Sequence, residues 1–296
     1  MRKPIEPVFG RLITAMVTPF DQAGDLDLLA ARHLAAHLVD EMGNDSLVIN
    51  GTTGEAPTTT VPEKNALVAA VKAEIGDRAK VLAGVGTFDT RHSVGLAKQA
   101  RDAGADGLLV VTPYYSLPPQ DGLLAHFLAV ADATDLPNVI YDIPHRTGRP
   151  VEQATMLALA EHPNIVAVKD AKKDIASSAQ VIAETELEYY AGDDAMVLPM
   201  LAIGGVGVVG TSTHFTGRRT KQLIQAWLDG DAALALSIFQ ELLPVYTGVF
   251  ATQGCMMVKA GLAHQGMPVG GLRLPLPSAS EQQAATFAAL LDACPL

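Results

Sequence analysis

The chain has 296 residues, 49% of them hydrophobic, and a formal net charge of −11 with an isoelectric point near 5.1. Such a chain can bury a large core as one large domain or as one domain with an appendage. Its acidity argues against nucleic acid and anionic membrane surfaces as partners, because both are bound by clustered lysine and arginine.

The start of the chain and its apolar runs predict neither a secretory signal nor a membrane span. MRKPIEPVFG begins with basic residues, but no apolar run follows them. No stretch approaches the 18 or more apolar residues that a membrane span needs. The two cysteines, Cys255 and Cys294, give no disulfide framework. We therefore expect a soluble cytoplasmic protein with reduced thiols that acts on small molecules.

Eight short apolar runs alternate with longer segments of helical periodicity. Segments such as LDLLAARHLAAHLVDEMG space their apolar residues as a helix does and end near a glycine. Most of the short runs are continuously apolar, as parallel strands buried on both faces must be. The predicted strands are 12–20, 46–51, 80–86, 106–115, 138–144, 164–170, 187–194 and 204–213.

Eight consecutive β-then-α units favour a (β/α)8 TIM barrel over an open doubly wound sheet. Beyond about Arg218 the strand pattern stops, and the rest of the chain is predicted as consecutive helices. We predict an α/β fold in which residues 1–225 form the barrel and residues 226–296 form a C-terminal helical appendage.

The active site of such a barrel lies at the C-terminal ends of its strands, and Lys169 ends a strand that is otherwise apolar. Burial there lowers the pKa of a lysine amine, and a neutral amine is the nucleophile that Schiff-base catalysis of ketones requires. The alternative is a solvated lysine at the end of a strand, like Lys172 and Lys173 beside it.

Other strand ends carry polar residues that fit the same chemistry. The motif GTTGE, residues 51–55, can bind a carboxylate or phosphate through its hydroxyls and backbone N–H groups, or can serve only as a turn. Tyr141 and the tyrosines of VTPYY can pack as amphipathic side chains or relay protons to an amine. Asp193 and Asp194 are either paired acids or a polar turn that starts a helix.

Two patterns are read as structural. The glycines of GGVGVVG do not form a dinucleotide fingerprint and are expected to allow close packing in the barrel. The histidines are scattered without the spacing of metal ligands, so no metal site is predicted.

In their order and spacing, GTTGE, VTPYY, YDIPHRTG, VAVKDA and AGDD resemble the dihydrodipicolinate synthase and N-acetylneuraminate lyase family of pyruvate-dependent class I aldolases. The likeness covers nearly the whole chain. It implies that Lys169 forms a Schiff base with pyruvate and that Tyr141 relays protons through Thr52 and Tyr115. It also implies that Tyr115 reaches across from a neighbouring subunit.

The resemblance implies the substrate contacts as well. Thr52 and Thr53 are expected to hold the pyruvate carboxylate, and the backbone at Gly192 and Val209 to line the same pocket. Arg146 matches the arginine that pairs with the carboxylate of L-aspartate 4-semialdehyde in the synthases, a role that suits a guanidinium fork.

The resemblance therefore favours condensation of pyruvate with L-aspartate 4-semialdehyde to 4-hydroxy-tetrahydrodipicolinate, in lysine and diaminopimelate biosynthesis. It implies a homotetramer built as a dimer of dimers, and no metal or organic cofactor. Two alternatives stay open: a pyruvate-dependent aldolase or lyase acting on a sugar acid, and a non-enzymatic barrel that keeps a ligand pocket. Loss of a catalytic residue would indicate the second alternative, and none is missing.

Feedback inhibition by L-lysine is predicted to be weak or absent. Family members that lysine inhibits use an interface site rich in histidine, asparagine and glutamate. Of the matching positions only Tyr114 is kept, and the others differ: Ala56, Val61, Lys64, Phe88 and His92.

Overall fold

The computed structural model describes residues 6–296, so the basic start of the chain, residues 1–5, lies outside the described part. Eight parallel strands close into a barrel, each paired with the next along the chain and the last with the first. This confirms the predicted (β/α)8 barrel. The strands are β1 (Leu12–Ala15), β2 (Ser46–Ile49), β3 (Lys80–Gly84), β4 (Gly107–Val111), β5 (Asn138–Asp142), β6 (Ile165–Asp170), β7 (Glu188–Ala191) and β8 (Gly207–Gly210).

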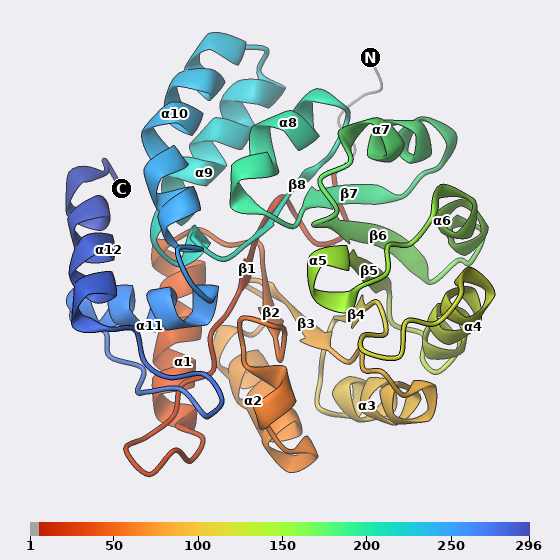
Figure 1. Ribbon diagram of the computed structural model, residues 1–296, viewed down its shortest axis with the longest axis horizontal. Coiled ribbons are helices and arrows are strands. Elements are labelled where there is room, and N and C mark those ends of the chain that lie inside the picture. The colour runs from red at the N-terminus through yellow and green to blue at the C-terminus, as the bar shows by residue number, and fades with distance from the viewer. Residues whose placement is uncertain (1–5) are drawn as a thin grey trace.

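Helices surround the barrel and continue past its last strand (Figure 1). Those between strands are α1 (Leu28–Ala36) with the π-helical turn η1 (His37–Glu41), η2 (Ala56–Thr58), α2 (Val61–Ile75), α3 (Thr90–Asp102), α4 (Gln120–Ala131), α5 (Pro144–Thr147), α6 (Gln153–Ala160), α7 (Ile175–Glu184), η3 (Asp194–Met196) and α8 (Val197–Ala202). The helices that follow β8 are α9 (Thr213–Leu228), α10 (Ala232–Gly248), α11 (Gly254–His264) and α12 (Glu281–Ala293).

The core has two layers, because side chains of a strand alternate between its two faces. One layer fills the barrel and includes Ile13, Val48, Tyr141 and Val209. The larger layer lies between the strands and the surrounding helices. Burial on both faces explains why the strands are continuously apolar in the sequence.

The eight strands lie where they are predicted, but most end earlier. β1 ends at Ala15, where the prediction extends to Phe20, and β4 ends at Val111, where it extends to Tyr115. After β1 the apolar pattern continues because the residues from Met16 to Phe20 stay buried although the strand has ended. After β4 burial does not extend to the predicted end, since Tyr115 is exposed. At Gly207, in the motif GGVGVVG, a Cβ atom would lie 2.0 Å from the carbonyl oxygen of Arg11, so the glycine allows close packing of the chain before β1 against β8.

The helices after β8 are confirmed, and α9 runs across the predicted boundary at residue 225. The division into a barrel of 1–225 and an appendage of 226–296 stays a prediction. Figure 1 shows α10, α11 and α12 together on the side of the barrel that carries α1 and α9. Within residues 6–296, the structure contains no helix long and apolar enough to cross a membrane.

Candidate active site

Lys169 lies inside the barrel near the C-terminal end of β6. Ala167 and Ala171, two residues to either side, belong to the apolar layer inside the barrel, so alternation turns the lysine side chain inward. It is only 5% exposed. The alternative of a solvated lysine is therefore wrong for Lys169.

Burial lowers the pKa of Lys169 to about 8, because desolvation disfavours the ammonium form. The positive charge of Arg146 acts in the same direction, and the negative charge of Asp194 opposes it. A much larger fraction of this amine is neutral at neutral pH than of an ordinary lysine. The site thus contains an amine that is suited to attack a carbonyl carbon.

Tyr141 lies directly beside the lysine, since the two residues are register partners in β5 and β6. The Lys169 Nζ atom lies 4.2 Å from the centre of the Tyr141 ring. Burial raises the pKa of Tyr141 to about 12, and a side-chain hydrogen bond to Thr52 opposes this rise. The phenol is therefore protonated at neutral pH and connects the lysine to the loop after β2.

The loop after β2 also reaches the end of β8. The hydroxyl oxygens of Thr53 and Thr211 lie 3.3 Å apart. Val209 is buried in the same layer inside the barrel as Tyr141. After β7, the N–H of Gly192 donates to the carbonyl oxygen of Asp170 at 2.7 Å, directly beyond Lys169 in the chain. The structure thus gathers the predicted residues of four strand ends around one lysine.

At Gly192 the neighbouring backbone leaves no room for a side chain. A Cβ atom there would lie 2.9 Å from the backbone carbonyl of Asp170. The absence of a side chain lets the backbone after β7 approach the backbone after Lys169.

Arg146 lies in the short helix α5, directly after β5. Its Nη1 atom donates to the Gln253 Oε1 atom at 3.0 Å. Its charge affects the pKa of both Tyr141 and Lys169, which places it near the mouth of the site. Gln253 comes directly before α11, so the C-terminal helical region contacts the predicted substrate-binding arginine.

Tyr115 is a predicted site residue whose side chain is almost fully exposed in the single chain. Its side chain is 93% exposed, and its backbone has a φ of 72°, which is unusual for a residue other than glycine. Within one chain the phenol does not close the site.

The two aspartates after β7 form the polar turn at which the helix η3 begins, which is one of the two predicted alternatives. Asp193 caps η3 by accepting from the Ala195 N–H at 3.0 Å. Asp194 is 1% exposed and accepts from the backbone N–H groups of Thr211 and Ser212 and from the Ser212 hydroxyl. Asp194 therefore fixes the loop after β8, which carries Thr211, and no geometry of paired acids results.

Within residues 6–296, no group of three or more histidine, cysteine, aspartate or glutamate side chains is placed to hold a metal ion. The chemistry described for this site is that of an amine, a phenol and hydroxyls. These groups can form an imine and move protons around it.

A protein-family model, described as the dihydrodipicolinate synthetase family, matches residues 8–294. The chain belongs to this family. A 4-hydroxy-tetrahydrodipicolinate synthase of Cutibacterium acnes is 59% identical over 286 residues, which cover 97% of this chain and 98% of the relative.

Solved structures of the family agree with the fold. A dihydrodipicolinate synthase of Bacillus anthracis has a TM-score of 0.95 and 36% identity, over 98% of this chain and all of the other. A dihydrodipicolinate synthase of Acinetobacter baumannii, determined in complex with pyruvate, has a TM-score of 0.93 and 30% identity, over 97% and 99% of the two chains.

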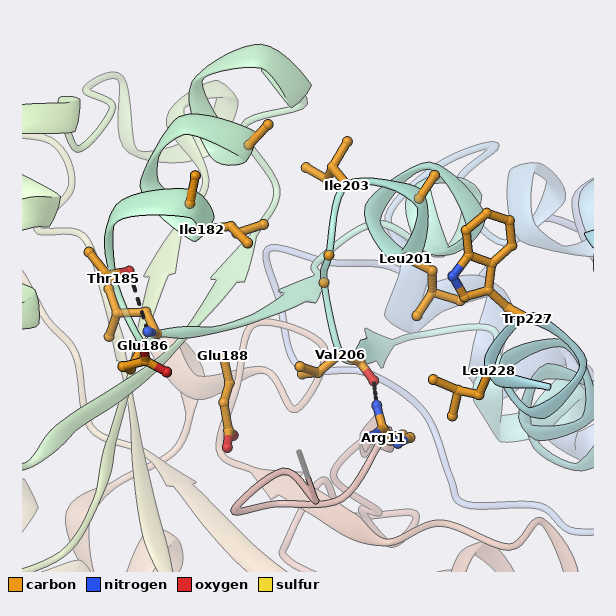
Figure 2. Close-up of a pocket in the computed structure, with 16 residues that line it drawn as sticks. Arg11, Ile182, Thr185, Glu186, Glu188, Leu201, Ile203, Val206, Trp227 and Leu228 are labelled. Carbon is orange, nitrogen blue, oxygen red and sulfur yellow. Dashed lines mark hydrogen bonds between the residues drawn. The ribbon is translucent and has the colours of Figure 1, made fainter. Parts of the chain in front are cut away.

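A cavity of about 650 Å³ lies at the opposite end of the barrel from Lys169. It is bordered by the start of β7 and by α7, α8 and the end of α9, and Figure 2 shows Ile182, Leu201, Ile203 and Trp227 around it. It is mostly apolar and contains none of the predicted site residues. In this family of barrels the chemistry belongs to the other face.

Three residues that contact the site or its loops have no role predicted from the sequence: Asp194, Gln253 and Lys259. For Asp194 the sequence allows either a paired acid or a polar turn, whereas Gln253 and Lys259 carry no prediction. Lys259 is the one that carries a signal in the sequence, because a lysine in the apolar helical segment GCMMVKAGLAHQG must be paired or lie at the surface.

Proposed function

We propose that the protein condenses pyruvate with L-aspartate 4-semialdehyde to form 4-hydroxy-tetrahydrodipicolinate, with Lys169 as the Schiff-base residue. The observation that carries this proposal is the buried amine of Lys169, with its lowered pKa, beside the Tyr141 phenol in a member of this family. The name of the 59% identical relative supports the synthase over a sugar-acid aldolase.

The first half of the reaction uses pyruvate. The neutral Lys169 amine attacks the ketone carbon, and loss of water gives an imine. Tyr141 supplies and removes the protons of these steps, in exchange with Thr52 and with Tyr115 of a neighbouring subunit. Thr53 and the backbone near Gly192 and Val209 hold the pyruvate. The protonated imine accepts the electron pair left when the pyruvate methyl group loses a proton, which gives an enamine.

The second half uses the aldehyde. The enamine carbon attacks the aldehyde carbon of the semialdehyde, whose carboxylate is held by Arg146. The amine of the substrate then attacks the imine carbon, closes the ring and displaces the Lys169 amine. Tyr141 accepts the proton that the pyruvate methyl group loses and returns a proton to the aldehyde oxygen, which becomes the 4-hydroxyl group, and water leaves in the imine-forming step.

The decisive experiment is intact-protein mass spectrometry after incubation with pyruvate and borohydride. We expect one reduced pyruvate adduct per chain, absent in Lys169→Ala and retained in the control Lys173→Ala, which changes a half-exposed lysine close in the chain. An adduct that persists in Lys169→Ala, or none in folded wild-type protein, would refute the proposed chemistry.

The proposal includes a cytoplasmic homotetramer in which Tyr115 enters a neighbouring site. Its 93% exposure and unusual backbone conformation support a side chain held out for another subunit. We would mix Lys169→Ala and Tyr115→Phe subunits after reversible dissociation. In a mixed oligomer, a site can combine Lys169 of the Tyr115→Phe subunit with Tyr115 of the Lys169→Ala subunit, so activity should return. If mass measurement verifies that mixed oligomers have formed and activity does not return, Tyr115 does not enter a neighbouring site.

A further inference from the structure

Glu55, the last residue of the motif GTTGE, takes no part in the proposed chemistry, yet its side chain is buried. Its Oε1 atom lies 2.8 Å from the Lys259 Nζ atom, and the two side chains are only 1% and 3% exposed. Its Oε2 atom accepts from the backbone N–H of Arg273 at 3.0 Å. Both oxygens of the carboxylate are therefore held by the C-terminal part of the chain.

The contacts of Glu55 belong to a larger assembly around Phe20, which follows β1. The Lys259 Nζ atom lies 4.4 Å from the centre of the Phe20 ring, and the Arg273 Cζ atom lies 4.3 Å from it. Lys259 also donates to the carbonyl oxygen of Gly271. The helix α11 and the segment after it are thereby joined to the loops that follow β1 and β2.

The loop after β2, which ends at Glu55, has an unfavourable backbone conformation at both of its ends. Asn50 has a φ of 60° and Glu55 a φ of 56°, so residues other than glycine adopt the left-handed conformation at both ends. Such conformations persist where the surrounding structure holds them, and they gather at functional sites. The Thr18 hydroxyl also donates to the carbonyl oxygen of Gly54 at 2.6 Å.

Between these two ends lie Thr52 and Thr53, the residues that contact Tyr141 and Thr211. The position of their hydroxyl groups depends on how the end of the loop is held. A buried ion pair is a weak source of stability, because desolvation of the two charges offsets their attraction. Its fixed geometry is better suited to orienting a loop.

We propose that Glu55 and Lys259 are positioning residues, which hold the loop after β2 so that Thr52 and Thr53 can bind pyruvate and pass protons to Tyr141. Through this pair the C-terminal helical region controls the pyruvate half of the reaction. The inference rests on the proposed function, since it takes from it the roles of the two threonines. It assigns a role to the motif glutamate and to a lysine outside the barrel strands.

The test uses full-length Glu55→Gln and Lys259→Met. We would measure the pyruvate concentration that gives half-maximal borohydride trapping, together with kcat, the KM for the semialdehyde, and Tm. A displacement of about 1 Å in a positioned group can cost on the order of 100-fold in rate. We expect the half-maximal pyruvate concentration to rise at least tenfold and kcat to fall, with the KM for the semialdehyde changed less than twofold.

The control is Lys72→Met, which breaks a lysine–carboxylate pair of 2.9 Å with Asp106 outside the loop after β2, at side chains that are 25% and 28% exposed. It is expected to lower Tm without changing pyruvate trapping. The double variant Glu55→Met with Lys259→Met leaves no unpaired buried charge. Its Tm should recover relative to Lys259→Met, while the pyruvate defect remains.

The outcomes separate a positioning role from a purely structural one. Normal pyruvate trapping and kcat in Glu55→Gln, or their recovery together with Tm in the double variant, would overturn the inference. If Lys259→Met does not fold, Glu55→Gln decides alone, because it keeps the shape of the side chain. Failure of wild-type protein to trap pyruvate would instead refute the proposed function itself.

Discussion

Replacing Lys169 with methionine should stabilise the protein at neutral pH while abolishing its activity. Methionine has a similar length and no charge, so it fits the apolar interior in which the lysine is 5% exposed. Burial removes water from the ammonium form of Lys169 and so destabilises the folded protein, whereas in the unfolded chain the ammonium stays hydrated. A residue needed for catalysis is thus predicted to destabilise the fold.

The magnitude follows from the pKa of Lys169, which is about 8 in the folded protein against 10.5 for an ordinary lysine. Each pKa unit corresponds to about 1.4 kcal/mol, so the lysine costs about 3 kcal/mol at a pH below 8. Between pH 8 and 10.5 the unfolded chain binds more protons than the folded one, so stability rises with pH. Above 10.5 the amine is neutral in both states and the cost disappears.

The assay is urea unfolding of wild type and Lys169→Met at a fixed protein concentration between pH 7 and pH 10.5. We expect the free energy of unfolding of the variant to exceed that of wild type by up to about 3 kcal/mol at pH 7, and the difference to shrink towards pH 10.5. Lys173→Met, at a half-exposed site, is the control. A difference that does not depend on pH would show that burial of the Lys169 ammonium does not cause it.

Arg146, Tyr141 and the region around Lys64 allow tests of catalysis and regulation. Arg146→Ala should raise the KM for the semialdehyde at least tenfold, since a charge-assisted hydrogen bond contributes about 1.5–3 kcal/mol, and should leave pyruvate trapping intact; equal loss for both substrates in steady-state kinetics would contradict its role. Tyr141→Phe should lower kcat by about 100- to 10,000-fold through loss of proton transfer, and a near-normal kcat would exclude the phenol as the relay. L-lysine at millimolar concentration should leave most of the activity. At the positions that match the family's lysine-binding site, the ammonium of Lys64 already donates to the carbonyl oxygens of Ala56 and Thr59. Strong inhibition in a lysine titration would show the prediction to be wrong.

Much of the fold could be predicted from local patterns. Strands buried on both faces have to be continuously apolar, and the helices between them have to be apolar on one face, so eight strand–helix units are visible along the chain. The place of Lys169 at the end of β6 followed from the same pattern. The ends of the strands could not be predicted as well, because burial continues after the hydrogen-bonded ladder stops, as it does from Met16 to Phe20.

For the pKa of Lys169, the sequence predicts only the direction of the shift. A lysine at the end of an apolar strand predicts a lowered pKa if it is buried, but the chain could equally have left it in water, as it does for Lys173. The contact with Tyr141 depends on the register of β5 against β6, which no local pattern specifies. Burial and register are properties of the closed barrel.

Periodicity and residue type are enough to predict the order of the elements, the kind of barrel and the residues whose chemistry suits a Schiff base. Which distant groups meet depends on the folded chain. Gln253 contacts Arg146, Asp194 holds the loop after β8, and Lys259 pairs with Glu55. Each of these contacts joins residues from separate elements, and buried polar groups select their partners by position in the folded chain rather than by spacing along it.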